Sequence, residues 1–305
     1  MKLKKTAKIT LIFLVALHGF FVGIGQPSIG EEGFSVIKEA YSYDKSLPLN
    51  TTITETQEFA TYTRAELYFT GVYERVGGYL AIPTTGDAPF PVVVLIDGMG
   101  GSKNRWFKED NWPNGLETVE ALIEKGFAVF TIDAAMHGER FDTTGVFPKP
   151  LTLRKNDLMY TVRDIIRHTV QDYRRGLDYL ETREDIDTNK IGVYGLSMGG
   201  AVTFILTGLE QRIKTAAVGV AVVYGNEYSL VNAYNFTPRI KTKPILMIMG
   251  DSDGYYTPGS ATQLFNTIGG DQNRLILFKG GHKVPVSYIP IIAEWFEQGL
   301  VQAKE

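Results

Sequence analysis

The sequence predicts an α/β fold, with a mostly parallel central sheet, helices on both of its faces and little or no lid. Short apolar runs alternate along the chain with segments of helix length, which is the order that a parallel sheet requires. The run 91–96 is apolar throughout, as expected for a central strand buried on both faces. The 305 residues, 44% hydrophobic and 21% charged, have the composition of an ordinary globular protein.

The first two strands are expected at 65–69 and 78–82, which bracket a turn and should pair antiparallel. The parallel strands are expected at 91–96, 128–132, 190–194, 215–222, 244–249 and 274–278. The helices are expected at 116–124, 157–181, 201–209, 259–267 and 287–302. Because the sequence contains no internal repeat, we expect a single α/β domain.

The helix at 157–181 can be tested by its spacing. Its apolar residues recur three or four positions apart, which is typical of an amphipathic helix packed on a sheet. Arg163, Arg167, Arg174 and Arg175 fall on the other side. We interpret these arginines as the face of the helix that contacts solvent.

The N-terminal residues 1–30 resemble an export signal, because a basic stretch precedes an apolar run. No clear cleavage site follows, and the apolar run is almost long enough to span a bilayer, so an uncleaved signal anchor remains an alternative. Either way, we expect the protein to be exported and its body to lie outside the cytoplasmic membrane. Residues 31–63 are interpreted as a polar, irregular lead-in, and residues 64–305 as the α/β domain.

Composition and charge exclude several classes of function. The net charge is −3, and the lysines of the N-terminal segment are included in it, so nothing supports nucleic-acid binding. The chain has no cysteine, which removes disulfides, thiolate catalysis and cysteine-ligated zinc. Contact with a membrane is expected only through the N-terminal segment.

The most informative motif is Gly-x-Ser-x-Gly at 195–199. A β-branched and aromatic run precedes it and a helix-like segment follows, which is the context in which such a serine becomes a nucleophile. A side chain at either outer glycine would crowd the strand or the helix. The turn should expose Ser197 at a helix N-terminus, where developing negative charge is favoured.

A serine nucleophile needs a base, and the chain offers four histidines. His18 lies in the export segment, and His168 lies in the middle of a predicted helix. His137 follows a strand upstream of Ser197, whereas His282 follows the last strand. The chain order of serine, acid and histidine that this architecture uses favours His282 as the base.

The acid is expected in the loop that follows the strand at 244–249. Two carboxylates are available there, Asp251 and Asp253. We prefer Asp253, and Asp251 is the alternative. Either aspartate could instead shape the loop by accepting hydrogen bonds from backbone amides two residues further on.

An oxyanion hole completes the predicted site. Backbone N–H groups directed at the developing oxyanion contribute several kcal/mol to catalysis. We expect one donor to be the amide of Met198, next to the nucleophile. The second is expected from the glycine-rich loop 97–103, with Met99 as the donor, although this loop could also be a plain glycine turn.

Together, the segment 176–200, the loop 98–101 and the Gly281–His282 ending resemble the α/β-hydrolase superfamily. Within it, they are most similar to the group of dienelactone hydrolases, acetyl xylan esterases and prolyl-oligopeptidase-like enzymes. The resemblance covers about residues 64–302. It implies a catalytic triad of Ser197, Asp253 and His282, with an oxyanion hole at Met99 and Met198.

Two residues depart from the pattern of this group. Asp97 stands where many members have histidine, which affects how the glycine loop is held. Ser197 stands where dienelactone hydrolases proper have cysteine, and this favours esterase or peptidase chemistry. No β-propeller precedes the hydrolase segment, so the size gating of prolyl oligopeptidases is not expected.

We therefore expect a serine esterase that forms an acyl-enzyme on Ser197 from a small-molecule ester. A peptidase or amidase with the same triad is one alternative, and a non-catalytic binding protein is another. The residues 141–156 and four aromatic residues are expected to form a modest wall over a small, open site. These aromatic residues are Tyr224, Tyr228, Tyr234 and Phe236.

No cofactor is expected, and no metal. Asp133 and His137 could form a metal pair, but the sequence offers no third ligand near them. We interpret this segment as a structural loop held by Asp133 or Arg140.

Overall fold

The computed structural model describes residues 29–109, 112–141, 149–153 and 158–302. The predicted export segment lies almost wholly outside these residues and stays a prediction. Within the described ranges, no helix combines the length and the apolar character needed to cross a membrane.

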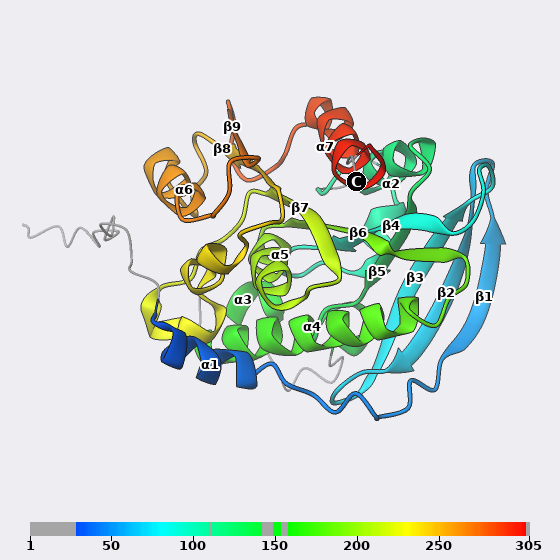
Figure 1. Ribbon diagram of the computed structural model, residues 1–305, viewed down its shortest axis with the longest axis horizontal. Coiled ribbons are helices and arrows are strands. Elements are labelled where there is room, and N and C mark those ends of the chain that lie inside the picture. Colours follow the sequence, from blue (N-terminus) through cyan, green and yellow to red (C-terminus); the bar gives the residue numbers. More distant parts are fainter. Residues whose placement is uncertain (1–28, 110–111, 142–148, 154–157, 303–305) are drawn as a thin grey trace, which may run out of the picture.

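The described chain contains nine strands that form one sheet, in the order β1-β2-β3-β5-β4-β6-β7-β8-β9 (Figure 1). The strands are β1 (Thr52–Glu58), β2 (Tyr62–Thr70), β3 (Arg75–Pro83), β4 (Phe90–Ile96), β5 (Ala128–Ile132), β6 (Ile186–Leu196), β7 (Ile213–Gly219), β8 (Ile245–Gly250) and β9 (Arg274–Phe278). Pairs from β1 through β3 to β5 are antiparallel, and all other pairs are parallel. The predicted α/β class and the antiparallel pairing of the first two predicted strands are confirmed.

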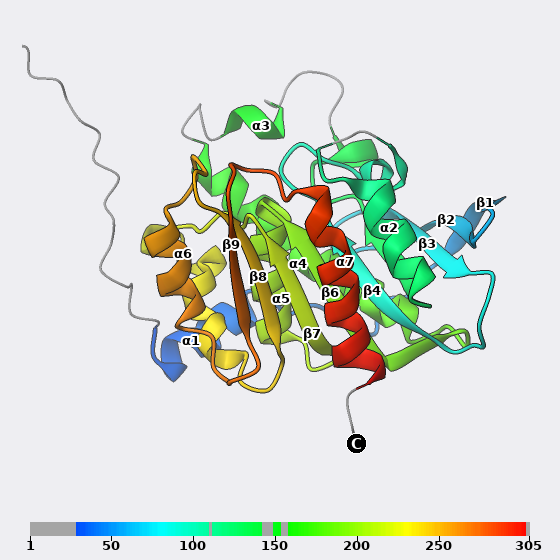
Figure 2. The same cartoon turned by 90° about the horizontal axis from the view of Figure 1, so that it is seen from above.

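The helices cover both faces of this sheet. They are α1 (Glu31–Glu39), α2 (Gly115–Glu124), α3 (Pro150–Leu153), α4 (Met159–Leu180), α5 (Met198–Leu209), α6 (Pro258–Phe265) and α7 (Ile289–Phe296). Figure 2 shows α2 and α7 side by side on one face, and α4 and α5 behind the strands on the other.

Side chains of β4 alternate between two separate hydrophobic cores. Val92 and Val94 belong to the core formed with α1, α4, α5 and α6, which we call the α4-side core. Val93 and Leu95 belong to the core formed with α2 and α7, which we call the α2-side core. The strand is buried throughout its centre because helices pack on both of its faces.

One strand is shorter than predicted. The run 215–222 is apolar to its end, but β7 stops at Gly219 because Val220 adopts a φ of 42°, which takes the chain out of the sheet. The next residues turn toward the carboxyl end of β6, where the amide of Val222 donates to the carbonyl of Ser197 at 3.2 Å.

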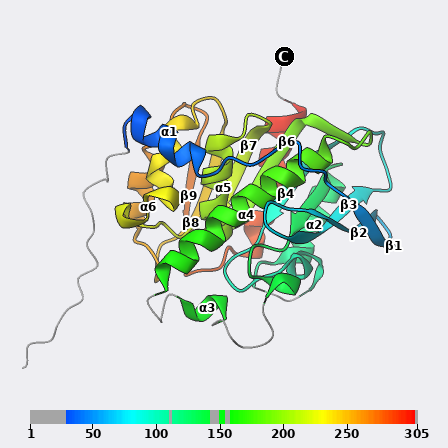
Figure 3. The same ribbon diagram turned by 90° about the horizontal axis from the view of Figure 1, so that it is seen from below.

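The interpretation of the lead-in as irregular is wrong, because it contains α1 and β1. Helix α1 buries Phe34 and Ile37 in the α4-side core. Strand β1 pairs with β2 at the edge of the sheet. Between them the chain runs along α4 (Figures 1 and 3).

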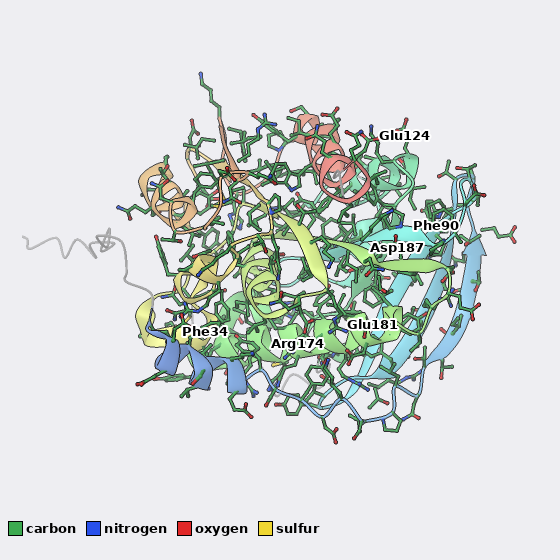
Figure 4. The ribbon with its side chains drawn as sticks, in the orientation of Figure 1. Phe34, Phe90, Glu124, Arg174, Glu181 and Asp187 are labelled. Carbon is green, nitrogen blue, oxygen red and sulfur yellow. The ribbon has the colours of Figure 1, made fainter. Side chains whose placement is uncertain are left out.

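This crossing also corrects the interpretation of the α4 arginines. Arg174 donates to the carbonyl of Tyr41 at 2.6 Å, and Arg175, which is 1% exposed, donates to the carbonyl of Leu47 at 2.6 Å. Figure 4 labels Arg174 on α4 and Phe34 on α1, on the flank where the lead-in crosses the helix. The arginines bind the backbone of the lead-in rather than facing solvent, and Arg163 is the exception, paired with its neighbour Asp164.

Candidate active site

Ser197 occupies the sharp turn between β6 and α5. Its backbone has φ 57° and ψ −117°, which is a strained conformation for a residue with a side chain. A Cβ at Gly195 would lie 2.2 Å from the carbonyl oxygen of Gly199, and a Cβ at Gly199 would lie 2.2 Å from that of Ile96. The two outer glycines of the motif are therefore required by the closeness of strand, turn and helix.

Ser197, His282 and Asp253 form one hydrogen-bonded chain. His282 Nε2 lies 2.8 Å from Ser197 Oγ, and His282 Nδ1 lies 2.7 Å from Asp253 Oδ2. The serine follows β6, the aspartate follows β8 and the histidine follows β9, so all three lie at the carboxyl edge of the parallel strands. The Asp253 side chain is fully buried, and the His282 side chain is 22% exposed.

The two candidate aspartates have different partners. Besides His282, Asp253 accepts a hydrogen bond from the amide of Tyr255 at 2.9 Å, so it also makes the two-residue turn that shapes the loop. Asp251 instead accepts from the amide of Gly280 at 3.1 Å and ties the β8 loop to the β9 loop. The structure thus brings Asp253, and not Asp251, to His282.

His137 and His168 contact residues other than Ser197. His137 is buried in the loop after β5, where its Nδ1 bonds to the carbonyl of Ala135 at 2.7 Å, and burial lowers its pKa to about 4. His168 lies on α4 against Tyr73, with ring centroids 4.1 Å apart, and burial lowers its pKa to about 4 as well. His18 lies outside the described residues.

Met99 and Met198 both line the cavity above Ser197. Neither of their backbone amides donates to another atom of the described residues. Met198 is the first residue of α5, so its N–H is one of those that a helix leaves unpaired. Among the described residues, nothing competes for these two amides, so both can bind an oxygen atom of a bound molecule.

Asp97 holds the loop that carries Met99. One carboxylate oxygen accepts from the amide of Gly98 at 2.6 Å, and the other accepts from the amide of Ser102 at 3.1 Å. The carboxylate occupies the space where a Cβ at Gly101 would stand, only 1.9 Å away. Burial raises the pKa of Asp97 to about 6, against the opposing influence of Arg105.

Two residues that the sequence did not single out anchor the His282 loop. The indole Nε1 of Trp112 donates to the carbonyl of His282 at 2.9 Å. The side-chain amide of Asn114 donates to the carbonyl of Val284 at 2.9 Å. Their partners are backbone carbonyls 170 residues further along the chain, and no sequence motif marks such a contact.

A cavity of about 340 Å³ opens over Ser197. Of the four aromatic residues expected around the site, Tyr224 lines it. Phe236 and Tyr234 are instead buried in the α4-side core, and Tyr228 packs against Tyr160 with ring centroids 6.0 Å apart. Short helix α3 supplies another part of the wall, whereas residues 142–148 and 154–156 of the expected wall lie outside the described ranges.

The segment after β5 is a structural loop. Asp133 accepts from the amides of Lys103 and Glu139, at 2.8 and 3.2 Å, and Arg140 donates to the carbonyl of Asp133 at 2.9 Å. Over the ranges that the structure describes, no three histidine, aspartate or glutamate side chains are grouped as metal ligands would be.

A serine on a strained turn between a strand and a helix, beside a histidine and an aspartate that follow later parallel strands, defines an α/β hydrolase. The sequence pattern of the family described as the dienelactone hydrolase family matches residues 76–280. The chain belongs to the dienelactone hydrolase family, and it is a hydrolase of that type.

The individual relatives share low sequence identity with this chain. YtaP of Bacillus subtilis (strain 168), named as a candidate hydrolase, is 26% identical over 146 residues, which are 47% of this chain and 47% of that protein. The match therefore spans about half the length of that relative.

The similar solved structures include two acetyl xylan esterases. The enzyme from Paenibacillus sp. R4 has a TM-score of 0.72 at 19% identity. The match covers 90% of this chain and 96% of the Paenibacillus chain. Acetyl xylan esterase 1 from Thermoanaerobacterium sp. JW/SL YS485 has a TM-score of 0.70 at 17% identity. The match covers 89% of this chain and 95% of that enzyme's chain. At these identities the likeness shows the shared fold.

Proposed function

We propose that this protein is a serine esterase that hydrolyses small carboxylic esters through an acyl-enzyme on Ser197. The observation that carries the proposal is the hydrogen-bonded chain from Ser197 Oγ to His282 Nε2, at 2.8 Å, and from His282 Nδ1 to Asp253 Oδ2, at 2.7 Å. This arrangement gives the serine a base and gives the base an orienting carboxylate.

In the first half of the reaction, His282 Nε2 takes the proton of Ser197 as Oγ attacks the ester carbonyl. The oxyanion that forms accepts hydrogen bonds from the amides of Met99 and Met198. Asp253 keeps the Nδ1–H of His282 directed toward it and stabilises the imidazolium. When the tetrahedral intermediate collapses, His282 gives its proton to the leaving alcohol oxygen.

In the second half, a water molecule takes the place of the alcohol. His282 removes a proton from this water as it attacks the acyl-enzyme carbonyl, and the same two amides bind the second oxyanion. Collapse returns the proton to Ser197 Oγ and releases the carboxylic acid.

An ester fits the cavity better than a peptide with a free amine. The described residues that line the cavity include no aspartate or glutamate, so none of them would pair with a substrate ammonium group. The single charged lining residue among them, Arg105, donates to the carbonyl of Gly100 at 2.8 Å.

The first experiment is labelling of the full-length protein with a fluorophosphonate probe, alongside turnover of p-nitrophenyl esters and matched p-nitroanilides. We expect labelling and ester turnover in the wild type, and loss of both in Ser197→Ala and His282→Ala. The matched controls are Ser46→Ala, at an exposed serine, and His168→Gln, at a histidine away from Ser197; both should keep labelling.

A folded wild type that neither labels nor turns over any ester would reject the enzyme and favour a binding protein. Anilide turnover comparable with ester turnover would favour the peptidase instead. Either outcome would replace the esterase proposal.

We further propose that the enzyme acts outside the cytoplasm on a small-molecule substrate, since the sequence of residues 1–30 has the pattern of an export signal. Fractionation of cells that make the full-length chain tests this. Recovery of the protein in the cytoplasm alone would contradict it.

A further inference from the structure

The cavity above Ser197 has two chemically different halves. Trp112 and Tyr255 lie beside His282, with ring centroids 5.9 and 4.4 Å from the imidazole, and we call this the aromatic half. Met159, Val162 and Val222 also line the cavity, and we call this the aliphatic half.

The aliphatic half and Trp112 of the aromatic half lie on opposite sides of the sheet. All three residues of the aliphatic half belong to the α4-side core or pack against it. Trp112 packs against the α2-side core, which includes Val284 of the His282 loop. Helices α4 and α2 cover opposite faces of the sheet (Figure 2). Ser197 lies after β6 at the carboxyl edge and lines the same cavity as both halves.

The proposed chemistry assigns a direction to the substrate. His282 must deliver a proton to the leaving alcohol oxygen, so the alcohol has to depart on the side of the imidazole, in the aromatic half. The carbonyl carbon is bonded to Oγ, and the acyl chain is the remaining substituent. It therefore extends away from His282, into the aliphatic half.

The aliphatic half has the chemistry of a hydrocarbon site. Its three side chains carry no charge and no hydrogen-bonding N–H or O–H group, and Val162 is only 3% exposed. Tyr224 lines the cavity from the same core and adds one hydroxyl group. Against Met159, Val162 and Val222, a polar or charged acyl group would lose water without gaining a hydrogen bond. A hydrocarbon chain would instead be stabilised by leaving water.

The size of the cavity exceeds what an acetyl group requires. If a methylene takes up about as much room as a water molecule, the cavity of about 340 Å³ holds roughly ten such groups, shared between acyl chain and alcohol. An acetyl methyl would leave most of the aliphatic half unfilled.

Building on the proposed esterase function, we propose that the substrate carries a medium-length, unbranched aliphatic acyl chain, roughly four to eight carbons long, that binds in the aliphatic half. Met159, Val162 and Val222 then determine acyl specificity, while Trp112 and Tyr255 contact the alcohol.

The test is kcat/KM of the full-length wild type for p-nitrophenyl acetate, butyrate, hexanoate, octanoate and laurate, which share one leaving group. We expect kcat/KM to rise about fourfold for each methylene that the cavity buries, so that hexanoate exceeds acetate at least tenfold. The increase should stop where the chain has filled the aliphatic half, before laurate.

Two variants test whether the aliphatic half causes this dependence of kcat/KM on acyl chain length. Met159→Trp fills it and should lower kcat/KM for hexanoate at least tenfold more than that for acetate. Val162→Ala enlarges it and should move the optimum to a longer chain. The matched control is Tyr160→Trp, which makes a similar change at a 66% exposed neighbour on α4 and should leave the profile unchanged.

Thermal unfolding and the rate of fluorophosphonate labelling show whether each variant is folded and active. A wild type that labels and prefers acetate overturns the acyl-chain proposal and leaves the esterase proposal intact. A Met159→Trp variant that slows all esters equally also overturns it. A folded wild type that cleaves no ester overturns both.

Discussion

The indole N–H of Trp112 binds the backbone carbonyl of His282, at 2.9 Å, so a residue before α2 fixes the loop that carries the candidate base. The imidazole itself is held from the other side by Asp253. Trp112 therefore sets where the backbone of this loop lies, and Asp253 sets how the ring is turned. The position of a catalytic base must be accurate to a fraction of an ångström, because small displacements from the reactive geometry lower the rate strongly.

We expect Trp112→Phe to lower kcat about 2- to 10-fold, because it removes one indole hydrogen bond from the His282 loop. Steady-state kinetics with a short-chain ester measures the effect. Trp295→Phe is the matched control, since Trp295 donates a similar bond to the carbonyl of Ala216, at 3.1 Å, away from the site. Equal losses of kcat in both variants would show that Trp112 acts only through general stability.

Gly195→Ala should cost about 3 kcal/mol of stability or more and abolish labelling of Ser197. The new Cβ would lie 2.2 Å from the carbonyl oxygen of Gly199, and the turn has no room to move. Thermal unfolding and fluorophosphonate labelling measure the two effects. The control is Gly259→Ala in α6, where the nearest atom is 3.8 Å away and alanine should stabilise the helix by up to about 1 kcal/mol.

The buried carboxyl of Asp97 should make stability depend on pH. Burial raises its pKa from 3.8 to about 6, so the folded state keeps this proton to a higher pH than the unfolded chain does. The stabilisation that results is complete below about pH 4 and is lost as the pH rises through 6.

Asp97→Asn removes this titration. The free energy of unfolding of the wild type, measured relative to the variant by urea denaturation, should therefore fall by about 2 kcal/mol between pH 4 and pH 7. Parallel pH curves for the two proteins would contradict the prediction.

Arg175→Met should release the lead-in segment from α4. Arg175 is buried and donates to the carbonyls of Leu47 and Thr70, at 2.6 and 3.3 Å, so the substitution removes both hydrogen bonds. We expect a loss of about 3 kcal/mol and faster hydrogen exchange at the amides of residues 40–50. Arg163→Met, at the arginine paired with Asp164, is the control and should change neither by a measurable amount.

The central strands and the serine turn could be predicted from the sequence because their causes are local. An apolar run such as 91–96 can be buried on both faces only in the middle of a sheet. The turn at Ser197 requires its two glycines wherever it occurs. The position of His282 followed from chain order, and the structure places that side chain against Ser197.

The lead-in could not be predicted, because the interactions that order it involve distant parts of the chain. Strand β1 carries mostly polar, exposed side chains, and it pairs with β2 through its backbone. Without an alternation of apolar residues, such a strand gives no sequence signal. The arginines of α4 were misinterpreted for the same reason, since a backbone carbonyl and water are equally good partners for a guanidinium group.

The sequence likewise could not decide whether Asp251 or Asp253 is the residue that contacts His282. Both belong to the same loop, and only the course of the β9 loop decides which carboxylate meets the imidazole. Tyr234 and Phe236 were expected near the serine because they follow β7, but their short turns carry them into the core.

Strand β1 has a consequence for how copies of this protein meet one another. It forms one outer edge of the sheet, and an open edge of this kind is a template for the strand of a second molecule. Glu55 and Glu58 stand exposed on that edge, so two copies approaching through it would bring carboxylates of like charge together. We expect these carboxylates to oppose edge-to-edge pairing of two copies through β1.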